Sequence, residues 1–204
     1  MILKNIIPWI RGNMSYNKGD LNAPFPQTVY LVINGTCNLH CKMCDVGMRE
    51  KDTQFYKNMN TGNMTMDTLN NIIQGILPNK PLVAIISTEP LLHPQIIEFI
   101  KTIKQHGMKV QLTTNGLLLP EFAKHLVDVD LDVLYVSIDG VRDVHNEIRG
   151  NPDAWDNAVK GMKTIYDYKK SEKKKNPHVR LNCTISGYNC DSLFEIPLSW
   201  YIAS

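Results

Sequence analysis

The feature that most constrains the fold of this chain is a repeated switch between short β-rich runs and longer amphipathic segments. The short runs are rich in Val, Ile, Leu and Thr, which favour strands. They span residues 29–33, 82–86, 109–113, 133–138 and 179–185. Between them, apolar residues recur at one-face helical spacing after the capping residue Thr65, over 93–105, after Pro120 and over 153–168. Strands that alternate with helices predict a parallel sheet with right-handed crossovers.

We therefore expect an α/β fold of about five parallel strands with outer helices, either an open sheet or a partial barrel. After the last of these elements and the polar loop that contains Cys190, only Asp191–Ser204 remain, and they contain no sixth run of strand-forming residues. The sequence predicts an N-terminal extension over 1–27 and a core domain over 28–204 that is incomplete at its C-terminus. An open edge in place of a sixth strand would be a surface at which a protein partner could bind.

Composition limits the classes of partner. A chain of 204 residues with 43% hydrophobic content can bury one substantial core, and its formal net charge of +2 offers no basic block for nucleic acid. The charge run Lys169–Lys175 is interpreted as a solvated helix end and loop. Lys4, Asn5 and Pro8 interrupt the apolar N-terminal stretch, which argues against a signal peptide, and no segment is long enough to span a membrane. We expect a soluble, cytoplasmic protein.

Polar residues follow the predicted strands. Ser87-Thr88-Glu89-Pro90 comes after the second, Thr114-Asn115-Gly116 after the third and Asp139-Gly140 after the fourth. Reactive groups of parallel α/β folds lie at the carboxyl ends of the strands. Asn-Gly and Asp-Gly also favour turns by themselves, whereas Glu89, between a β-branched residue and a proline, is harder to explain as turn chemistry.

Three cysteines follow the first strand. Cys37, Cys41 and Cys44 fall within eight residues, and loops this short bring three thiolates to one centre at little entropic cost. Five cysteines in all, an odd number, argue for a metal or redox site over a disulfide framework. Three protein thiolates on a four-iron cluster would leave one iron open to a small molecule.

Other interpretations of the cysteines remain open. Structural zinc would need a fourth ligand, which His40, Asp45 or His93 could supply. Three free core cysteines are disfavoured because the segment is polar. Cys183 is expected to be a small buried residue within the fifth strand, and Cys190 a free thiol in a polar loop.

With these motifs in order, the sequence resembles the radical S-adenosylmethionine (SAM) superfamily, and in particular its molybdenum-cofactor-type and SPASM-type members. Cys37, Cys41 and Cys44 match the CxxxCxxC signature in the loop after the first strand of a partial (β/α) barrel. Ser87-Thr88-Glu89-Pro90 stands where the family has Gly-Gly-Glu-Pro, and Met43 where it usually has an aromatic residue. The resemblance covers about residues 28–187 and also includes Ser137-Ile138-Asp139-Gly140 and Ile148-Arg149-Gly150.

The resemblance implies a [4Fe-4S] cluster on the three cysteines and SAM beside it. Carbonyls of Ser87, Thr88 and Glu89 would bind the SAM amino group, with Glu89 shaping the turn. The remaining contacts implied are Met43 on adenine, Ser137 and Arg149 on the ribose and carboxylate, and Asn115 near the cofactor. A guanidinium suits a carboxylate because it can pair bidentately, although Arg149 could also be an ordinary exposed residue in the loop before a helix.

The implied reaction is reductive cleavage of SAM to a 5′-deoxyadenosyl radical that abstracts hydrogen from a small-molecule or peptide substrate. It would need an electron donor such as flavodoxin or ferredoxin. Two other classes stay open: an iron-sulfur or zinc protein without SAM chemistry, and a truncated, inactive relative of the enzymes. Anaerobic reconstitution followed by a search for 5′-deoxyadenosine separates the three.

Overall fold

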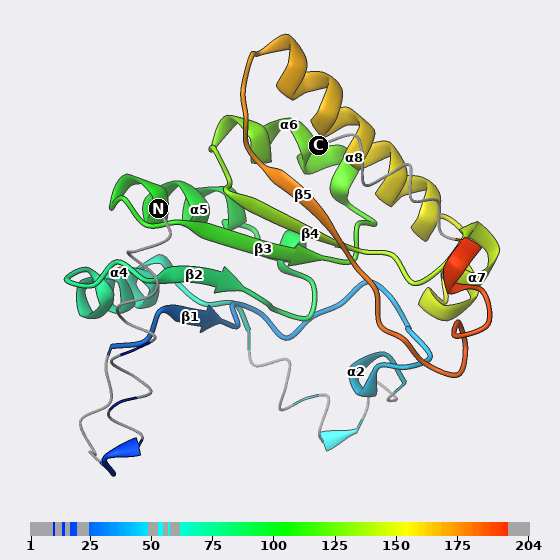
Figure 1. Cartoon of the computed structure of the whole chain (residues 1–204), viewed down its shortest axis with the longest axis horizontal. Helices are drawn as coiled ribbons and strands as arrows, with labels where there is room; N and C mark the ends of the chain where they lie inside the picture. Colours follow the sequence, from blue (N-terminus) through cyan, green and yellow to red (C-terminus); the bar gives the residue numbers. More distant parts are fainter. Residues whose placement is uncertain are drawn as a thin grey trace.

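The computed structural model describes residues 25–48 and 62–195, together with positions 10, 14, 17–19, 53, 54 and 57. One parallel sheet forms its centre (Figure 1). The strands are β1 (Thr28–Leu31), β2 (Leu82–Ile85), β3 (Val110–Thr114), β4 (Val133–Ser137) and β5 (His178–Asn182). They lie side by side in chain order, and all four neighbouring pairs are parallel. The predicted sheet of five parallel strands is confirmed.

The strand order decides between the two expected architectures. A doubly wound sheet reverses its order at a switch point, whereas β1-β2-β3-β4-β5 never reverses. When the strand order follows the chain order throughout, right-handed crossovers all lie on one face of the sheet, as in a barrel. The helices on that face are α4 (Met66–Ile76), α5 (Ile96–Gln105), α6 (Leu119–Asp128) and α8 (Ala154–Ser171). The fold is therefore the partial (β/α) barrel that the sequence predicted.

The core lies between the sheet and these helices. One side of α5 is completely buried there through Ile96, Phe99, Ile100 and Ile103, which are at most 1% exposed. The outer helices α6 and α8 approach one another closely at Gly161 of α8. A Cβ added to this glycine would lie only 2.5 Å from Leu119 Cγ of α6. The helix side of the sheet is thus filled by the core, and reactive groups are expected at the carboxyl ends of the strands.

Several boundaries differ from those expected. Residues 93–105 do not form one helix, because Pro90–Leu92 form the 3-10 turn η1 and α5 begins only at Ile96. A helix that the sequence did not indicate, α7 (Arg142–Arg149), follows β4. β5 ends at Asn182, so Cys183 lies after the strand and is half-buried, which corrects the expectation of a buried strand residue.

The remaining described elements are short. α2 (Asp45–Met48) follows the last cysteine of the cluster, and η2 (Leu193–Glu195) lies beyond β5. The lysine run begins in the last turn of α8, as expected for a solvated helix end. Among the described helices none is long and apolar enough to cross a bilayer. Most of the N-terminal extension, residues 1–27, lies outside the described residues.

Candidate functional site at the carboxyl ends of the strands

The loop that carries the cysteines lies at the carboxyl end of the sheet, beside α7 (Figure 1). Its main chain is attached to that helix, because Lys42 N–H donates to Ile148 C=O over 2.8 Å. Gly150 ends α7 with a φ of +66°, and a Cβ there would lie 2.8 Å from the carbonyl oxygen of His40. Only glycine combines this conformation with so close an approach. The last turn of α7 therefore sets the position of the cysteine loop.

The three thiols of this loop are free. Cys41 is buried, while Cys37 and Cys44 are half-buried. Burial raises the pKa of the Cys37 and Cys41 thiols above the ordinary value of 9.0, because a thiolate loses its hydration there. An electropositive partner such as iron would reverse that cost.

Asn115 lies against the first of these cysteines. Its side-chain Nδ2 lies 3.8 Å from Cys37 Sγ and donates to Asn38 Oδ1 at 2.8 Å. Its Oδ1 accepts from the N–H of Leu117 over 2.9 Å, as an Asx turn requires. The predicted place of Asn115 next to the cluster loop and its plain role in an Asn-Gly turn thus coexist.

Arg149 lies against the second cysteine and is buried, with a side chain that is only 9% exposed. Its Nη2 forms an ion pair with Asp139 Oδ2 at 2.7 Å, and its Nη1 lies 3.8 Å from Cys41 Sγ. The guanidinium opposes the rise in the Cys41 pKa that burial causes. The alternative of an ordinary exposed arginine in a loop was wrong, because residue 149 ends α7 and faces the interior.

Two buried nitrogens beside this ion pair have no hydrogen-bond partner in the described part of the chain: Arg149 Nε and His145 Nε2. His145 Nδ1 accepts the N–H of Asp139 at 3.1 Å, so its proton is on Nε2. Burial and the charge of Arg149 lower the pKa of His145 from 6.5 to about 4. Buried donors without partners are rare and cost free energy, so they mark a place where a ligand with acceptor atoms fits.

Glu89 organises the opposite side of the site and is completely buried. One carboxyl oxygen accepts from Leu91 N–H at 3.0 Å and from the Thr114 hydroxyl at 2.7 Å, and the other accepts from Asn115 N–H at 2.7 Å. Burial raises the pKa of Glu89 above 4.5, and these hydrogen bonds oppose the rise. The carboxyl group therefore ties the loop after β2 to the end of β3.

The hydroxyls of the neighbouring residues fasten the loop after β1. Ser87 Oγ accepts from Ile33 N–H at 2.6 Å and from Asn34 N–H at 3.2 Å, and the Thr88 hydroxyl donates to the carbonyl of Thr36. These side chains make hydrogen bonds within the protein, and the Glu89 carbonyl accepts from Asn34 Nδ2 at 2.9 Å. A contact through carbonyls is what the resemblance implied.

The other expected contacts are distributed around the same end of the sheet. Ser137 is the last residue of β4 and is paired in register with Asn182. Met43 is half-buried and immediately precedes Cys44. The structure thus brings Asn115 to Cys37 and Arg149 to Cys41, with Ser137 at a neighbouring strand end. Sequence reasoning assigned no role to Asp139, which pairs with Arg149, or to His145, which accepts the Asp139 N–H, although both lie in the motifs that carry the resemblance.

The donor set suits an iron-sulfur cluster better than a single ion. Within the described ranges, no three His, Cys, Asp or Glu side chains are arranged to hold one metal ion. Three cysteines of a four-iron cluster bind three different irons and need not converge on a point. Both nitrogens of His93, a possible zinc ligand, are used by Met64 C=O at 2.9 Å and Gln95 N–H at 3.1 Å. Three soft thiol donors in a short loop fit iron and sulfide.

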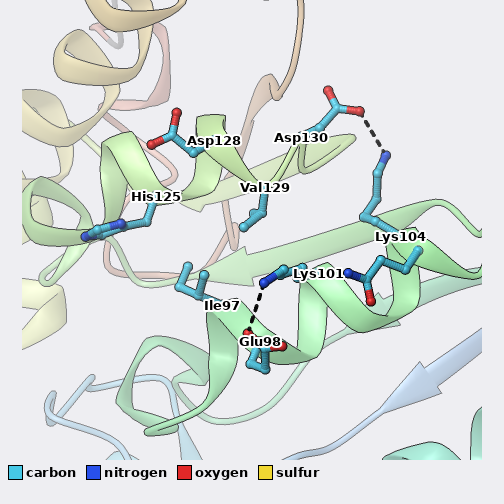
Figure 2. A pocket seen from close by; sticks show the side chains of 9 residues that line it. Ile97, Glu98, Lys101, Lys104, His125, Asp128, Val129 and Asp130 are labelled. Atoms are coloured by element: carbon cyan, nitrogen blue, oxygen red, sulfur yellow. Dashed lines mark ion pairs between the residues drawn. The ribbon is translucent and has the colours of Figure 1, made fainter.

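A groove of about 640 Å³ lies elsewhere, between α5 and α6 (Figure 2). Several of its lining residues are charged, and two of its lysines already have partners: Lys101 pairs with Glu98 at 3.8 Å and Lys104 with Asp130 at 3.3 Å. The residues after α6 lead into the start of β4, so the groove lies toward the amino ends of the strands. It is separate from the cysteine loop.

Known proteins resemble this chain in sequence. The family model described as "Radical SAM superfamily" matches residues 31–181. The AdoMet-dependent heme synthase of Methanosarcina barkeri is 28% identical over 171 residues, which cover 82% of this chain and 45% of that protein. The GTP 3′,8-cyclase of Alkaliphilus oremlandii is 30% identical over 174 residues, or 79% of this chain and 48% of that protein. The chain thus spans less than half the length of these relatives.

A solved structure has the same fold. Streptococcus suis SuiB bound to the precursor peptide SuiA superposes with a TM-score of 0.66 at 17% identity, covering 91% of this chain and 39% of that one. At this identity the likeness concerns architecture alone.

Proposed function

Because the chain belongs to the radical SAM superfamily, whose members use a [4Fe-4S] cluster and SAM, we propose that it holds such a cluster on Cys37, Cys41 and Cys44 and cleaves SAM reductively. When bound, cluster and SAM supply a 5′-deoxyadenosyl radical that removes a hydrogen atom from the substrate. The residues of the chain would hold the cluster through the thiolates, orient SAM and exclude water.

The observation that carries the proposal is the placement of Arg149. A buried cation lies 3.8 Å from Cys41 Sγ and keeps an unpartnered Nε–H in the described part of the chain. A carboxylate that reaches the open corner of the cluster would lie next to both the thiolate and this donor. We assign the Arg149 Nε–H to the SAM carboxylate, with Asp139 holding the guanidinium in place.

The remaining assignments follow the positions of the side chains. Carbonyls of the 87–89 segment bind the SAM amino group, Ser137 the ribose, and Met43 packs on the adenine. Asn115 Nδ2 supports the Cys37 thiolate by hydrogen bonding. Each of these groups lies at the same end of the sheet, within loops that main-chain and buried hydrogen bonds fix.

The substrate is a small molecule or a peptide. The relatives named above are a heme synthase and a GTP cyclase, and the structural neighbour binds a precursor peptide. Reduction of the cluster requires an electron donor such as flavodoxin or ferredoxin. The edge of β5 that pairs with no other strand in the described part of the chain is the surface at which we place a further protein partner. A cytoplasmic location is part of the same proposal, because a reducing compartment keeps the thiols free.

The test is anaerobic reconstitution with iron and sulfide, reduction in the presence of SAM and detection of 5′-deoxyadenosine. Wild type should bind four irons and form the product, following the general family chemistry. Cys37→Ala, Cys41→Ala and Cys44→Ala should each abolish both, whereas the matched control Cys190→Ala, which removes an exposed thiol, should abolish neither. A cysteine-loop variant that still makes 5′-deoxyadenosine would refute the assignment.

The Arg149→Lys variant tests the finer assignment in the same samples. Lysine keeps the positive charge but loses the fork that serves Asp139, Cys41 and a ligand at once. Iron content should stay near that of wild type while SAM binds at least about tenfold more weakly, the loss expected for a charge-assisted hydrogen bond. Unchanged SAM affinity would remove Arg149 from the SAM site. Cluster without cleavage in wild type would point to a carrier or an inactive relative, and zinc without sulfide to a structural site.

A further inference from the structure

The face of the sheet away from the helices carries side chains that the proposed function has not used. Side chains alternate between the two faces of a strand. In β4, Leu134 and Val136 are buried in the core on the helix side, so Tyr135 and Ser137 belong to the opposite face. We call this opposite face the inner face.

One row of the inner face runs across all five strand positions. The register pairs Thr113 with Tyr135 and Tyr135 with Arg180. In β1, β2 and β3, Leu31 pairs with Ile85 and Ile85 with Leu112. The residue that follows each of them, Val32, Ile86 and Thr113, therefore lies in the same row as Tyr135 and Arg180. We define Val32, Ile86, Thr113, Tyr135 and Arg180 as the inner row.

The inner row lies next to the proposed SAM site. Ser137 and Asn182 form the next register pair on the inner face, two residues along toward the carboxyl ends of the strands. Two residues along a strand correspond to about 6.6 Å. If Ser137 binds the ribose of SAM as proposed, a molecule on the inner row would lie beside the cofactor.

The two ends of the row have different chemistry. Arg180 is exposed and held against Tyr135, with its Nη1 donating to the tyrosine hydroxyl at 3.1 Å and its Cζ 5.8 Å from the ring centroid. Within the described residues, no carboxylate lies in ion-pair distance of this guanidinium. A cation that is oriented by an aromatic neighbour but not neutralised by an acid is ready to bind an anion.

The opposite end of the row is apolar and open. Val32 is 62% exposed and Ile86 is 42% exposed, and Tyr30, two residues toward the amino end of β1, is 64% exposed. Large apolar side chains that gather on one face beside a functional site mark a binding surface. The three lie across the sheet from Arg180.

We propose that the inner row is the substrate surface, that Arg180 binds a carboxylate or phosphate of the substrate, and that Val32 and Ile86 contact its apolar part. The substrate class is therefore an organic anion with a substantial apolar body. The inference rests on the proposed function, because only a radical formed at the strand ends makes a molecule on this row a substrate.

Binding measurements on the reconstituted chain with SAM present test the proposal. The probes are two charged molecules and their uncharged counterparts: a nucleoside triphosphate with its nucleoside, and a porphyrin carboxylate with its methyl ester. At least one anion should bind more tightly than its uncharged counterpart, and which one does distinguishes phosphate from carboxylate. Arg180→Ala should weaken that binding by at least about tenfold, and Arg180→Lys by less, since lysine keeps charge but not the fork.

Lys124→Ala is the matched control. Lys124 is also a cation over a tyrosine ring, with its Nζ 5.5 Å from the centroid of Tyr168, but it lies among the outer helices. Its loss should leave anion binding unchanged. Tyr135→Phe, which removes only the hydroxyl that orients Arg180, should give a smaller loss than Arg180→Ala and guards against misfolding of the arginine variant.

Three results would overturn the proposal: wild type that binds neither anion better than its neutral counterpart, Arg180→Ala that binds the anion normally, or Lys124→Ala that loses as much affinity. Failure of the proposed function is seen separately, as absence of iron, sulfide or 5′-deoxyadenosine in the same wild-type samples. A chain that cleaves SAM but fails the anion test retains its function and loses only the substrate class.

Discussion

Glu89 and Arg149 are buried charged groups at the same end of the sheet, and their surroundings differ in one respect. Both carboxyl oxygens of Glu89 accept hydrogen bonds from the chain itself. Arg149 pairs with Asp139 and approaches Cys41, yet its Nε has no partner among the described residues. The Glu89 carboxylate is satisfied by the chain itself and holds the loops together, whereas the Arg149 guanidinium has a donor to offer. Asn34, whose Nδ2 donates to Glu89 C=O at 2.9 Å, also has an unpartnered buried oxygen, Oδ1, among the described residues. Burial alone therefore does not distinguish a structural charge from a binding one; the unused hydrogen-bonding capacity does.

The largest expected effect comes from removing the counter-charge on the Arg149 side. Asp139→Ala would leave a buried guanidinium without its carboxylate and should lower the free energy of unfolding by about 3–5 kcal/mol. Urea denaturation of the variant measures it. The double variant Asp139→Ala/Arg149→Met removes both charges and should recover part of the loss. If the single variant were as stable as wild type, the ion pair would not hold this side together.

A smaller effect follows from His145, whose pKa is lowered to about 4 in the folded chain. Between pH 6.5 and 4 the unfolded chain takes up a proton at this residue that the folded chain does not. Stability should therefore fall as the pH decreases through this window, by up to about 3 kcal/mol. Asn in place of His145 can still accept the N–H of Asp139 but cannot be protonated, so His145→Asn should remove this slope. The matched control His125→Asn, at an exposed position of α6, should retain it.

Glu89 should contribute a slope of the opposite sign. Its folded pKa is raised above 4.5, so above that pH the unfolded chain releases a proton that the folded chain still holds, and stability falls as the pH rises. Comparing denaturation of wild type and His145→Asn over the same pH range therefore separates the two sides of the site. A His145→Asn variant with the slope of wild type would show that His145 is not buried in its neutral form.

The smallest effect is expected at an exposed ion pair between the cysteine loop and α7. Lys42 of the cysteine loop pairs with Glu147 of α7 at 2.6 Å, with side chains that are 39% and 70% exposed. Solvent screens such a pair, so Glu147→Gln should leave the melting temperature unchanged within error. A marked drop would mean that surface charge, and not the main-chain contact of Lys42 with Ile148, attaches the loop to α7.

Local patterns predicted the fold well because each strand and outer helix has its own apolar periodicity. The β-rich runs around Val83 and Leu134 and the helix stripe of Ile96, Ile100 and Ile103 are legible without tertiary information. α7 was missed because its sequence is mostly polar, and only Val144 and Ile148 show helical spacing. Gly150 after Ile148-Arg149 was the available stop signal.

The site was only half predictable for a related reason. Spacing identified the cysteines, and the unusual position of Glu89 marked it as more than a turn residue. Asp139 was taken as turn chemistry, because nothing in Asp-Gly shows that the carboxylate will be buried against an arginine ten positions later. His145 likewise lies in the helix that the sequence did not indicate. Partners brought together by a missed element cannot be found by local reasoning.

The sequential strand order also bears on how the chain reaches this structure. Each strand pairs with the one made just before it, so a nascent chain can extend the sheet one strand-helix unit at a time. The cysteine loop is the exception, because its anchor arrives late: Cys41 and Arg149 are 108 positions apart. Ser87, Thr88 and Asn115 can hold the start of the cysteine loop earlier. Iron delivered before α7 has emerged would meet a Cys41 that still lacks its contact with Arg149.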